Sequence, residues 1–146
     1  MRSLQSFRIT VEDVLRQIAR PNSVVIMATD SDKTLVASVE ACQRKEGEAG
    51  IWMLAVDPTR RQANIGRRVL AYAETFSKEA WQVKTVWLNV LSSNVELTAW
   101  YIRRGYKKTG KVTPFARELA LQFKLDESLH FVDMEKTLHE HRPGHG

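Results

Sequence analysis

The sequence contains little that would tie the chain to a membrane or to an oxidising compartment. Cys42 is the only cysteine, so an internal disulfide is excluded. The longest apolar runs, such as Val24–Ala28, fall far short of the roughly 20 residues that cross a bilayer. The first six residues lack the apolar stretch of a secretory signal. We therefore expect a cytoplasmic protein without a membrane partner.

Low-complexity tracts and internal repeats are also absent. A hydrophobic share of 43% and a charged share of 27% are ordinary for a soluble globular protein, which argues against disorder over most of the chain. With 146 residues the chain has room for one domain, which we place at residues 1–138. Residues 139–146 are polar and contain Gly and Pro, and are predicted to form a disordered tail. The tail histidines have no cysteine or buried carboxylate beside them, so no metal site is predicted.

Acidic residues are outnumbered, and the net charge is +5. Such a surplus attracts polyanions, among them nucleic acids and phosphorylated cofactors. The basic residues form two groups along the chain, namely Arg60, Arg61, Arg67 and Arg68, and then Arg103, Arg104, Lys107 and Lys108. A nucleic-acid binder is the weaker interpretation, because the sequence has no recognisable reading helix or aromatic platform.

Hydrophobic periodicity predicts a mixed α/β domain around one sheet. Residues 5–9 alternate like a short edge strand, and Thr10 then has the form of a helix N-cap, with Pro21 ending that helix. Further strands are expected at Val24–Thr29, Leu35–Cys42, Ile51–Val56, Thr85–Leu91, Tyr106–Val112 and Leu129–Leu138. A first long helix has its apolar stripe on Ile65, Val69, Ala73, Phe76 and Ala80. A second helix has its core face on Val95, Ala99 and Ile102.

The turn between the Ile51–Val56 strand and the first long helix has the composition of a phosphate site. A helix N-terminus has a partial positive charge and unpaired N–H groups. Arginines at this end are unfavourable for an isolated helix, so their presence indicates a bound anion. Gly66 would let a ligand approach the backbone, and Asn64 tolerates the left-handed conformation. The alternative is a solvated basic turn.

The second helix places a polar pair beside its core face. The segment from Ser93 to Glu96 has the pattern of a capping box. On a helical wheel, Asn94, Leu97 and Tyr101 then lie on one side. The amide of Asn94 and the phenol of Tyr101, on the same side of the helix and beside its core face, suggest that this side forms the wall of a cleft. The alternative is that Tyr101 packs at the core margin with its hydroxyl on a backbone carbonyl.

These motifs together resemble those of the GNAT acetyltransferase superfamily. The family has a strand ending in Val-x-Pro, followed by Arg/Gln-x-x-Gly-x-Gly/Ala at the start of a helix. This chain has Val56-Asp57-Pro58 and then residues 61–66, with Asn64 in place of the first motif glycine. The family's later signature, an Asn, a short helix with a Tyr and a Gly–aromatic pair, is matched by Asn94, Tyr101 and Gly105-Tyr106. The match is good over about a third of the chain.

The resemblance implies a mostly antiparallel sheet flanked by helices and acetyl-CoA as co-substrate, without a metal. The backbone of Leu54 and Val56 would hold the pantetheine arm and polarise the thioester carbonyl. The implied pyrophosphate-binding residues are Arg61, Gln62, Ala63, Asn64, Ile65, Gly66 and Arg67. Tyr101 would protonate the leaving thiolate as general acid, and Asn94 would orient the cofactor or a water. A homodimer is an expectation from the family only.

The amine acceptor and its base are less well defined. The family often has a glutamate at the position that Gly50 occupies here. Glu48 shares that face if the strand extends back, and Glu40 and Glu46 are alternative bases. The acceptor, a small-molecule or peptide amine, would meet the segment Thr113–Asp126 with Phe115 and Phe123, and Trp52 is another candidate. Without a base, the chain would be a non-catalytic acyl-CoA binding or sensing domain.

Overall fold

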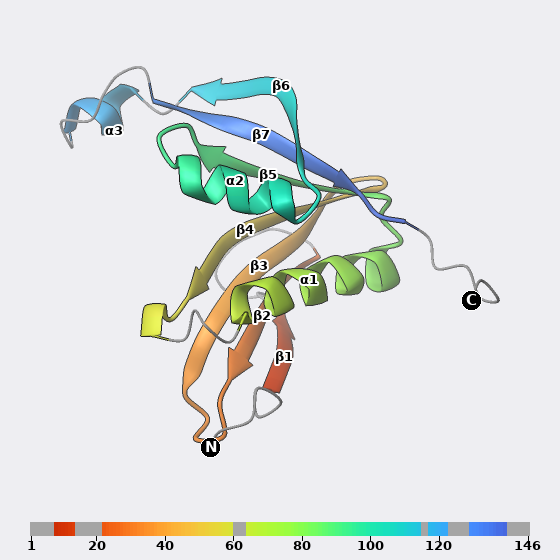
Figure 1. The fold of residues 1–146 in the computed structure, drawn as a ribbon. Helices are drawn as coiled ribbons and strands as arrows, with labels where there is room; N and C mark the ends of the chain where they lie inside the picture. Colours follow the sequence, from red (N-terminus) through yellow and green to blue (C-terminus); the bar gives the residue numbers. More distant parts are fainter. Residues whose placement is uncertain (1–7, 14–21, 60–63, 115–116, 123–128, 140–146) are drawn as a thin grey trace. The chain divides into compact units, whose positions relative to one another are not determined.

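A computed structural model describes residues 8–13, 22–59, 64–114, 117–122 and 129–139 (Figure 1). The chain forms two compact units, the first from Met1–Val86 with Thr137–Gly146 and the second from Trp87–Lys136. Each unit mixes strands with helices. The predicted tail falls outside the described residues except for His139, whose carbonyl accepts a hydrogen bond from Lys78 Nζ.

Four antiparallel strands form the sheet of the first unit in the order β1-β2-β3-β4. They are β1 (Arg8–Asp13), β2 (Ser23–Thr29), β3 (Leu35–Lys45) and β4 (Glu48–Val56). The β2–β3 turn is closed by Asp30 Oδ1, which accepts from the backbone N–H groups of Asp32 and Thr34 at 2.9 and 3.0 Å. Gly47 has a φ of 79° in the β3–β4 turn, a conformation that glycine adopts at little cost.

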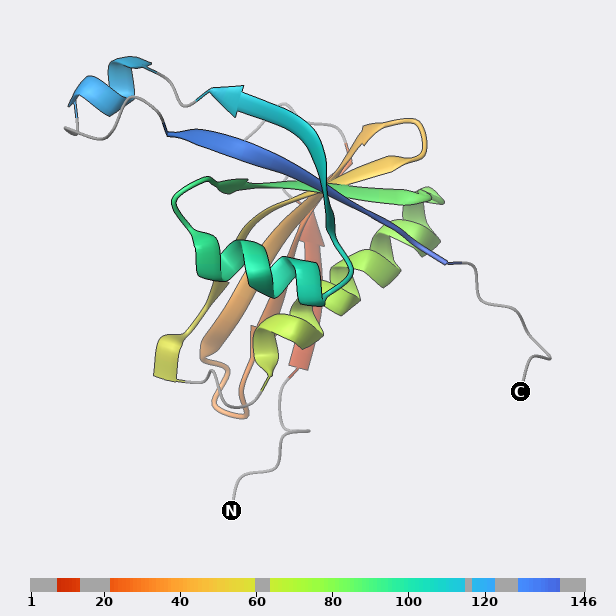
Figure 2. The same cartoon turned by 45° about the horizontal axis from the view of Figure 1, so that its top comes forward.

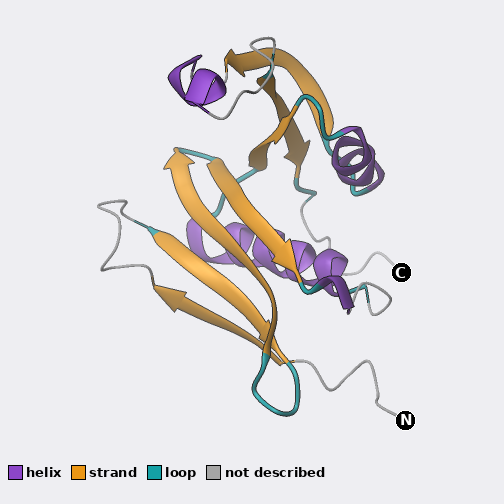
Figure 3. Ribbon diagram, turned by 90° about the vertical axis from the view of Figure 1, so that its left-hand side faces the viewer, coloured by secondary structure: helices purple, strands orange, loops and turns teal. Residues whose placement is uncertain are grey.

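Helix α1 (Ile65–Trp81) packs against β2, β3 and β4. Figure 3 shows it along one face of these strands. The predicted apolar stripe is confirmed at Ile65, Val69 and Ala73, which are at most 1% exposed, whereas Ala80 is exposed near the end of the helix. Because β-strand side chains alternate between faces, the buried residues Ile26, Val39, Ala41 and Ile51 belong to the face that α1 covers.

The second unit has the strand order β5-β7-β6, with β7 inserted between the two strands that precede it in sequence. The elements that lie wholly or mostly in it are β5 (Thr85–Leu91), α2 (Val95–Arg103), β6 (Lys107–Pro114), α3 (Arg117–Gln122) and β7 (His130–Thr137). β6 and β7 are antiparallel. The backbone N–H of Ser92 donates to the carbonyl of His130 at 2.7 Å beside the end of β5. Helix α2 lies alongside β5 in two views (Figures 1 and 2).

The predicted mixed class with mostly antiparallel strands is confirmed, but three local predictions are wrong. Residues 8–13 form β1, so no helix starts at Thr10, because every residue of this segment pairs with β2 and the run Ile9-Thr10-Val11 is β-branched. The rest of that predicted helix, residues 14–21, lies outside the described residues. α2 is capped by Asn94 and not by Ser93. Its expected core residues Val95 and Ile102 are 72% and 50% exposed. The buried residue of α2 is Tyr101. No helix in the described part of the chain has the length and apolar composition needed to cross a membrane.

Candidate functional site

Strand β4 contains a bulge at Leu54. In the β3–β4 ladder, Glu40 pairs with Trp52, but Ser38 pairs with Ala55. Two residues of β4, Met53 and Leu54, therefore oppose the single residue of β3 between these pairs. A bulge removes backbone polar groups from the regular ladder and bends the strand, and bulges are over-represented beside active sites. The bulge at Leu54 thus provides backbone groups outside the regular β3–β4 ladder, just before the paired residues Ala55 and Val56.

The turn that follows β4 is held by local hydrogen bonds. Asp57 Oδ1 accepts from Thr59 N at 2.9 Å and from Thr59 Oγ1 at 2.8 Å. The backbone N–H of Asp57 donates to the carbonyl of Val36 at 2.8 Å, which ties the turn to β3. The predicted binding residues Arg61, Gln62 and Ala63, and Arg60 before them, lie outside the described residues.

Helix α1 begins without a side-chain cap. Its N-cap residue, Asn64, has φ 56° and ψ 32°, the left-handed conformation, and makes no side-chain capping hydrogen bond. The first bond of the helix runs from Arg68 N to the Asn64 carbonyl at 3.1 Å. The N–H groups of Ile65, Gly66 and Arg67 therefore precede the intrahelical ladder. The first turn contains no acidic residue. Asn64 thus adopts the left-handed conformation that its residue type was expected to tolerate.

Asn94 and Tyr101 both lie on α2 in the second unit. Asn94 is exposed, and its Oδ1 accepts from Leu97 N at 3.1 Å, so part of its side chain serves as the helix cap. Tyr101 is only 6% exposed and contacts the rings of Trp100 and Tyr106 edge-on, at centroid distances of 5.2 and 5.6 Å. Burial raises the pKa of the Tyr101 phenol from 10.0 to about 12. This hydroxyl therefore keeps its proton throughout the physiological pH range.

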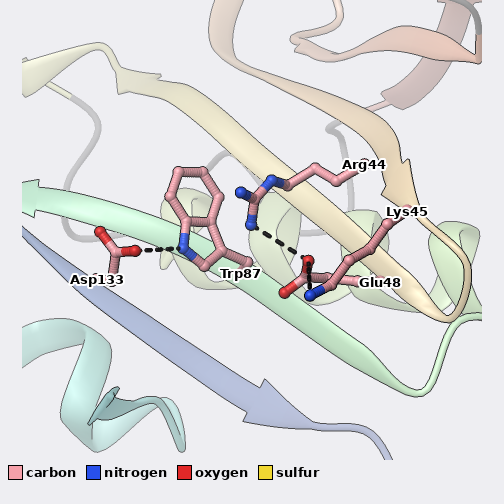
Figure 4. Close-up of polar contacts among 5 residues, drawn as sticks. All are labelled: Arg44, Lys45, Glu48, Trp87 and Asp133. Carbon is pink, nitrogen blue, oxygen red and sulfur yellow. Dashed lines mark hydrogen bonds and ion pairs between the residues drawn. The ribbon is translucent and has the colours of Figure 1, made fainter. Parts of the chain in front are cut away.

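The candidate base Glu48 lies on β4, as the sequence required, but it is held in an ion-pair cluster. Its Oε2 is 3.3 Å from Arg44 Nη1 and 3.7 Å from Lys45 Nζ (Figure 4). Arg44 reaches it from a second bulge, because β3 has one extra residue between the pairs Gln43–Ala49 and Lys45–Glu48. Glu48 is 7% exposed, whereas Glu46 is exposed in the turn.

Gly50 occupies the position where the family often has a glutamate, and its space is filled. A Cβ added there would lie 2.5 Å from Cη2 of Trp52 and 2.7 Å from Cδ of Arg44. Trp52 is therefore a sheet-face residue that lies over Gly50 and leaves no room for a side chain. Phe115 and Phe123, the other predicted acceptor contacts, fall in segments that the structure does not describe.

Two buried carboxylate oxygens lack partners within the described part of the chain, Glu40 Oε1 and Asp133 Oδ1. Glu40 was one of the alternative bases. Asp133 was not expected from the sequence. Its Oδ2 accepts from the indole Nε1 of Trp87 at 3.1 Å (Figure 4). Trp87 and Asp133 are 46 residues apart, and no sequence motif indicated that they meet.

Comparison with known proteins identifies the family. Residues 3–106 match the family model of the acetyltransferase (GNAT) family. The chain belongs to the GNAT family. This match extends the resemblance beyond the two motifs, since it includes β1 to β5 and α2. The described residues of this GNAT protein contain no group of three or more His, Cys, Asp or Glu that could hold a metal ion.

Solved structures show the same fold at low sequence identity. A Bacillus anthracis protein assigned as a streptothricin acetyltransferase, in complex with acetyl coenzyme A, is 18% identical with a TM-score of 0.66, over 84% of this chain and 66% of that chain. Nourseothricin acetyltransferase is 20% identical with a TM-score of 0.66, over 90% and 83%. A Vibrio cholerae spermidine N-acetyltransferase is 15% identical with a TM-score of 0.66, over 82% and 68%. No curated protein matches the chain in a direct sequence comparison.

Proposed function

We propose that this GNAT protein transfers an acetyl group from acetyl-CoA to an amine of a small molecule or peptide, by direct attack in a ternary complex. The donor is supported by membership of the family and by the Bacillus anthracis relative, which was solved with acetyl coenzyme A. An amine acceptor is supported by relatives such as the Vibrio cholerae spermidine N-acetyltransferase. A cytoplasmic location and a homodimer belong to the same proposal, and cell fractionation and light scattering test them.

The observation that carries the proposal is the succession of a bulge, a turn and an uncapped helix start in the first unit. The bulge takes Leu54 out of the regular ladder, and the backbone of Leu54, with that of Val56 at the end of β4, would hold the pantetheine arm and polarise the thioester carbonyl. The N–H groups of Ile65, Gly66 and Arg67 bind the pyrophosphate at the positive end of α1. Arg61, Gln62, Ala63 and Asn64 complete this set of cofactor-binding residues.

Tyr101 is the proposed general acid. When the C–S bond breaks, the sulfur of coenzyme A leaves with the electron pair and needs a proton. A buried phenol whose pKa is raised to about 12 is fully protonated at neutral pH, so it is available as a donor. Because Oδ1 of Asn94 caps α2, its amide nitrogen is the group left to orient the cofactor or a water.

A carboxylate on the β3–β4 hairpin is the proposed base. Glu48 is the candidate from the sequence, and both of its ion pairs among the described residues use Oε2, so Oε1 would be the accepting oxygen if Glu48 were the base. A second function, acyl-CoA binding without catalysis, is favoured by one observation. The family's usual glutamate position is Gly50, which Trp52 and Arg44 cover.

Calorimetry with acetyl-CoA and a thiol-release assay with a panel of amines test the proposal. An acetyltransferase binds acetyl-CoA and releases thiol only when an amine is added. Thiol release should be lost in Tyr101→Phe while acetyl-CoA binding survives. Binding without amine-dependent thiol release would instead indicate the non-catalytic domain. Absence of binding at millimolar acetyl-CoA would contradict both functions.

A further inference from the structure

Glu40 is a carboxylate in the middle of a sheet with one oxygen left unsatisfied. It pairs with Val25 of β2 and with Trp52 of β4, so it has a strand on each side. Its Oε1 is buried and has no hydrogen-bond partner among the described residues. Buried polar groups in folded proteins are nearly always paired, and an unpaired one calls for an explanation, such as a catalytic role. An ammonium group is a natural partner for a carboxylate oxygen.

The register places Glu40 directly beside the β4 bulge. Trp52, its cross-strand partner, is the last regularly paired residue before Met53 and Leu54. Side chains directly opposite each other in an antiparallel pair have Cβ atoms about 4.5–5.5 Å apart. Glu40 and Trp52 therefore share the face opposite α1, next to the backbone that we propose for the thioester.

Distance along the strand separates Glu40 from the other carboxylates of this hairpin. Glu48 is four residues before Trp52, which corresponds to about 13 Å at the rise of a β-strand. It is also already paired with Arg44 and Lys45. Glu46 is exposed in the turn beyond it. Of these three carboxylates, only Glu40 combines a position beside the bulge with an unpaired oxygen.

We infer that Glu40 binds the ammonium group of the acceptor and takes the proton that must leave before attack. This inference rests on the proposed acetyl transfer. The proton passes from nitrogen to the Glu40 carboxylate, and the neutral amine forms the C–N bond with the thioester carbon. The C–S bond then breaks, the sulfur leaves with the electron pair and is protonated, and the second proton of the nitrogen passes to solvent. The substrate class is a primary amine that is protonated at neutral pH, with an apolar stem that suits the half-buried Val25.

Three glutamate-to-glutamine variants test the assignment, because they remove charge with little change in shape. Glu40→Gln removes the proposed base, Glu48→Gln removes the sequence candidate, and Glu79→Gln, on the exposed side of α1, is the matched control. Each variant is assayed for acetyl-CoA affinity by calorimetry and for thiol release with benzylamine, hexylamine and spermidine at neutral pH. Thermal unfolding checks that each variant is folded.

We expect Glu40→Gln to lower kcat/KM for the best of these amines about 100- to 10,000-fold, with the Kd of acetyl-CoA within about twofold of the wild type. Glu79→Gln should match the wild type. A Glu40→Gln variant that keeps its activity within about threefold of the wild type would overturn the assignment of Glu40 but not the proposed acetyl transfer. A large loss of activity in Glu48→Gln alone would do the same. Wild-type protein that binds acetyl-CoA but acetylates none of the three amines would also overturn it. Failure to bind acetyl-CoA at all would instead refute the proposed function itself.

Discussion

The left-handed residue at the start of α1 offers a clean test of the cofactor site. Asn64 has φ 56° and ψ 32° and makes no side-chain capping bond, so a substitution there changes backbone preference without removing a hydrogen bond. The left-handed conformation costs an ordinary L-residue roughly 1–2 kcal/mol, and asparagine less. Asn64→Ala should therefore lower the free energy of unfolding by about 1 kcal/mol. Asn64→Gly removes the strain but adds flexibility to the unfolded chain, so the two effects should nearly cancel.

A change in the backbone conformation at residue 64 should also weaken acetyl-CoA binding. If Asn64→Ala relaxes toward the right-handed region, the N–H groups of Ile65 to Arg67 turn away from the pyrophosphate. A loss of about 1.4 kcal/mol in binding corresponds to a tenfold higher Kd for acetyl-CoA. Urea unfolding measures the free energy of unfolding and calorimetry measures the Kd for acetyl-CoA, with Asn64→Gly as the matched control. An alanine variant with the stability and the Kd of the wild type would contradict this prediction. A glycine variant that binds acetyl-CoA more weakly than the alanine variant would contradict it as well.

Four further predictions follow from the described contacts. Tyr101→Phe should reduce thiol release about 100- to 10,000-fold at unchanged acetyl-CoA affinity. Burial raises the pKa of Tyr101 from 10.0 to about 12, so the phenol loses its proton at lower pH in the unfolded chain than in the folded one. The free energy of unfolding of the wild type should therefore fall by at most about 3 kcal/mol as the pH rises from 10 to 12. Urea titrations at each pH should show that the phenylalanine variant lacks this component. Gly50→Ala should cost about 1–3 kcal/mol in urea unfolding, since its methyl group would meet an indole ring at 2.5 Å, and an unchanged midpoint would contradict that packing. Gly66→Val should weaken acetyl-CoA binding by crowding the pyrophosphate, and a folded variant with the wild-type Kd would exclude this site. Trp87→Phe should lower the free energy of unfolding by about 1–3 kcal/mol, because Asp133 loses its hydrogen-bond donor. Asp133→Asn keeps an acceptor oxygen and should lower it less. Equal unfolding midpoints for the two variants would contradict a stabilising role for this hydrogen bond.

Local patterns in the sequence determined most of the secondary structure. Apolar alternation located β2, β3 and β4, and the β5 prediction coincides with the strand, Thr85–Leu91. The spacing of Ile65, Val69 and Ala73 identified the buried side of α1, because one face of a helix repeats every 3.6 residues. These signals depend only on neighbouring residues, so a single sequence suffices to read them.

The same local reasoning failed where a long-range partner decides the outcome. Thr10 and the residues after it have a capping pattern, yet they form β1, because pairing with β2 satisfies their backbone. Val95 and Ile102 have helical spacing, but Tyr101 is the buried residue of α2. Helical periodicity states which residues share a face, but what covers that face depends on the tertiary structure.

The sequence by itself determined the family motifs, the basic turn before α1 and the left-handed tendency of Asn64, all of which are properties of contiguous residues. Only the tertiary structure decided the β4 bulge, the filled space at Gly50 and the unpaired oxygen of Glu40. Each of these depends on the register between strands, and a shift of one residue moves every side chain to the other face. The candidate base was therefore ambiguous in the sequence, and our proposal of Glu40 rests on its position opposite Trp52 at the bulge.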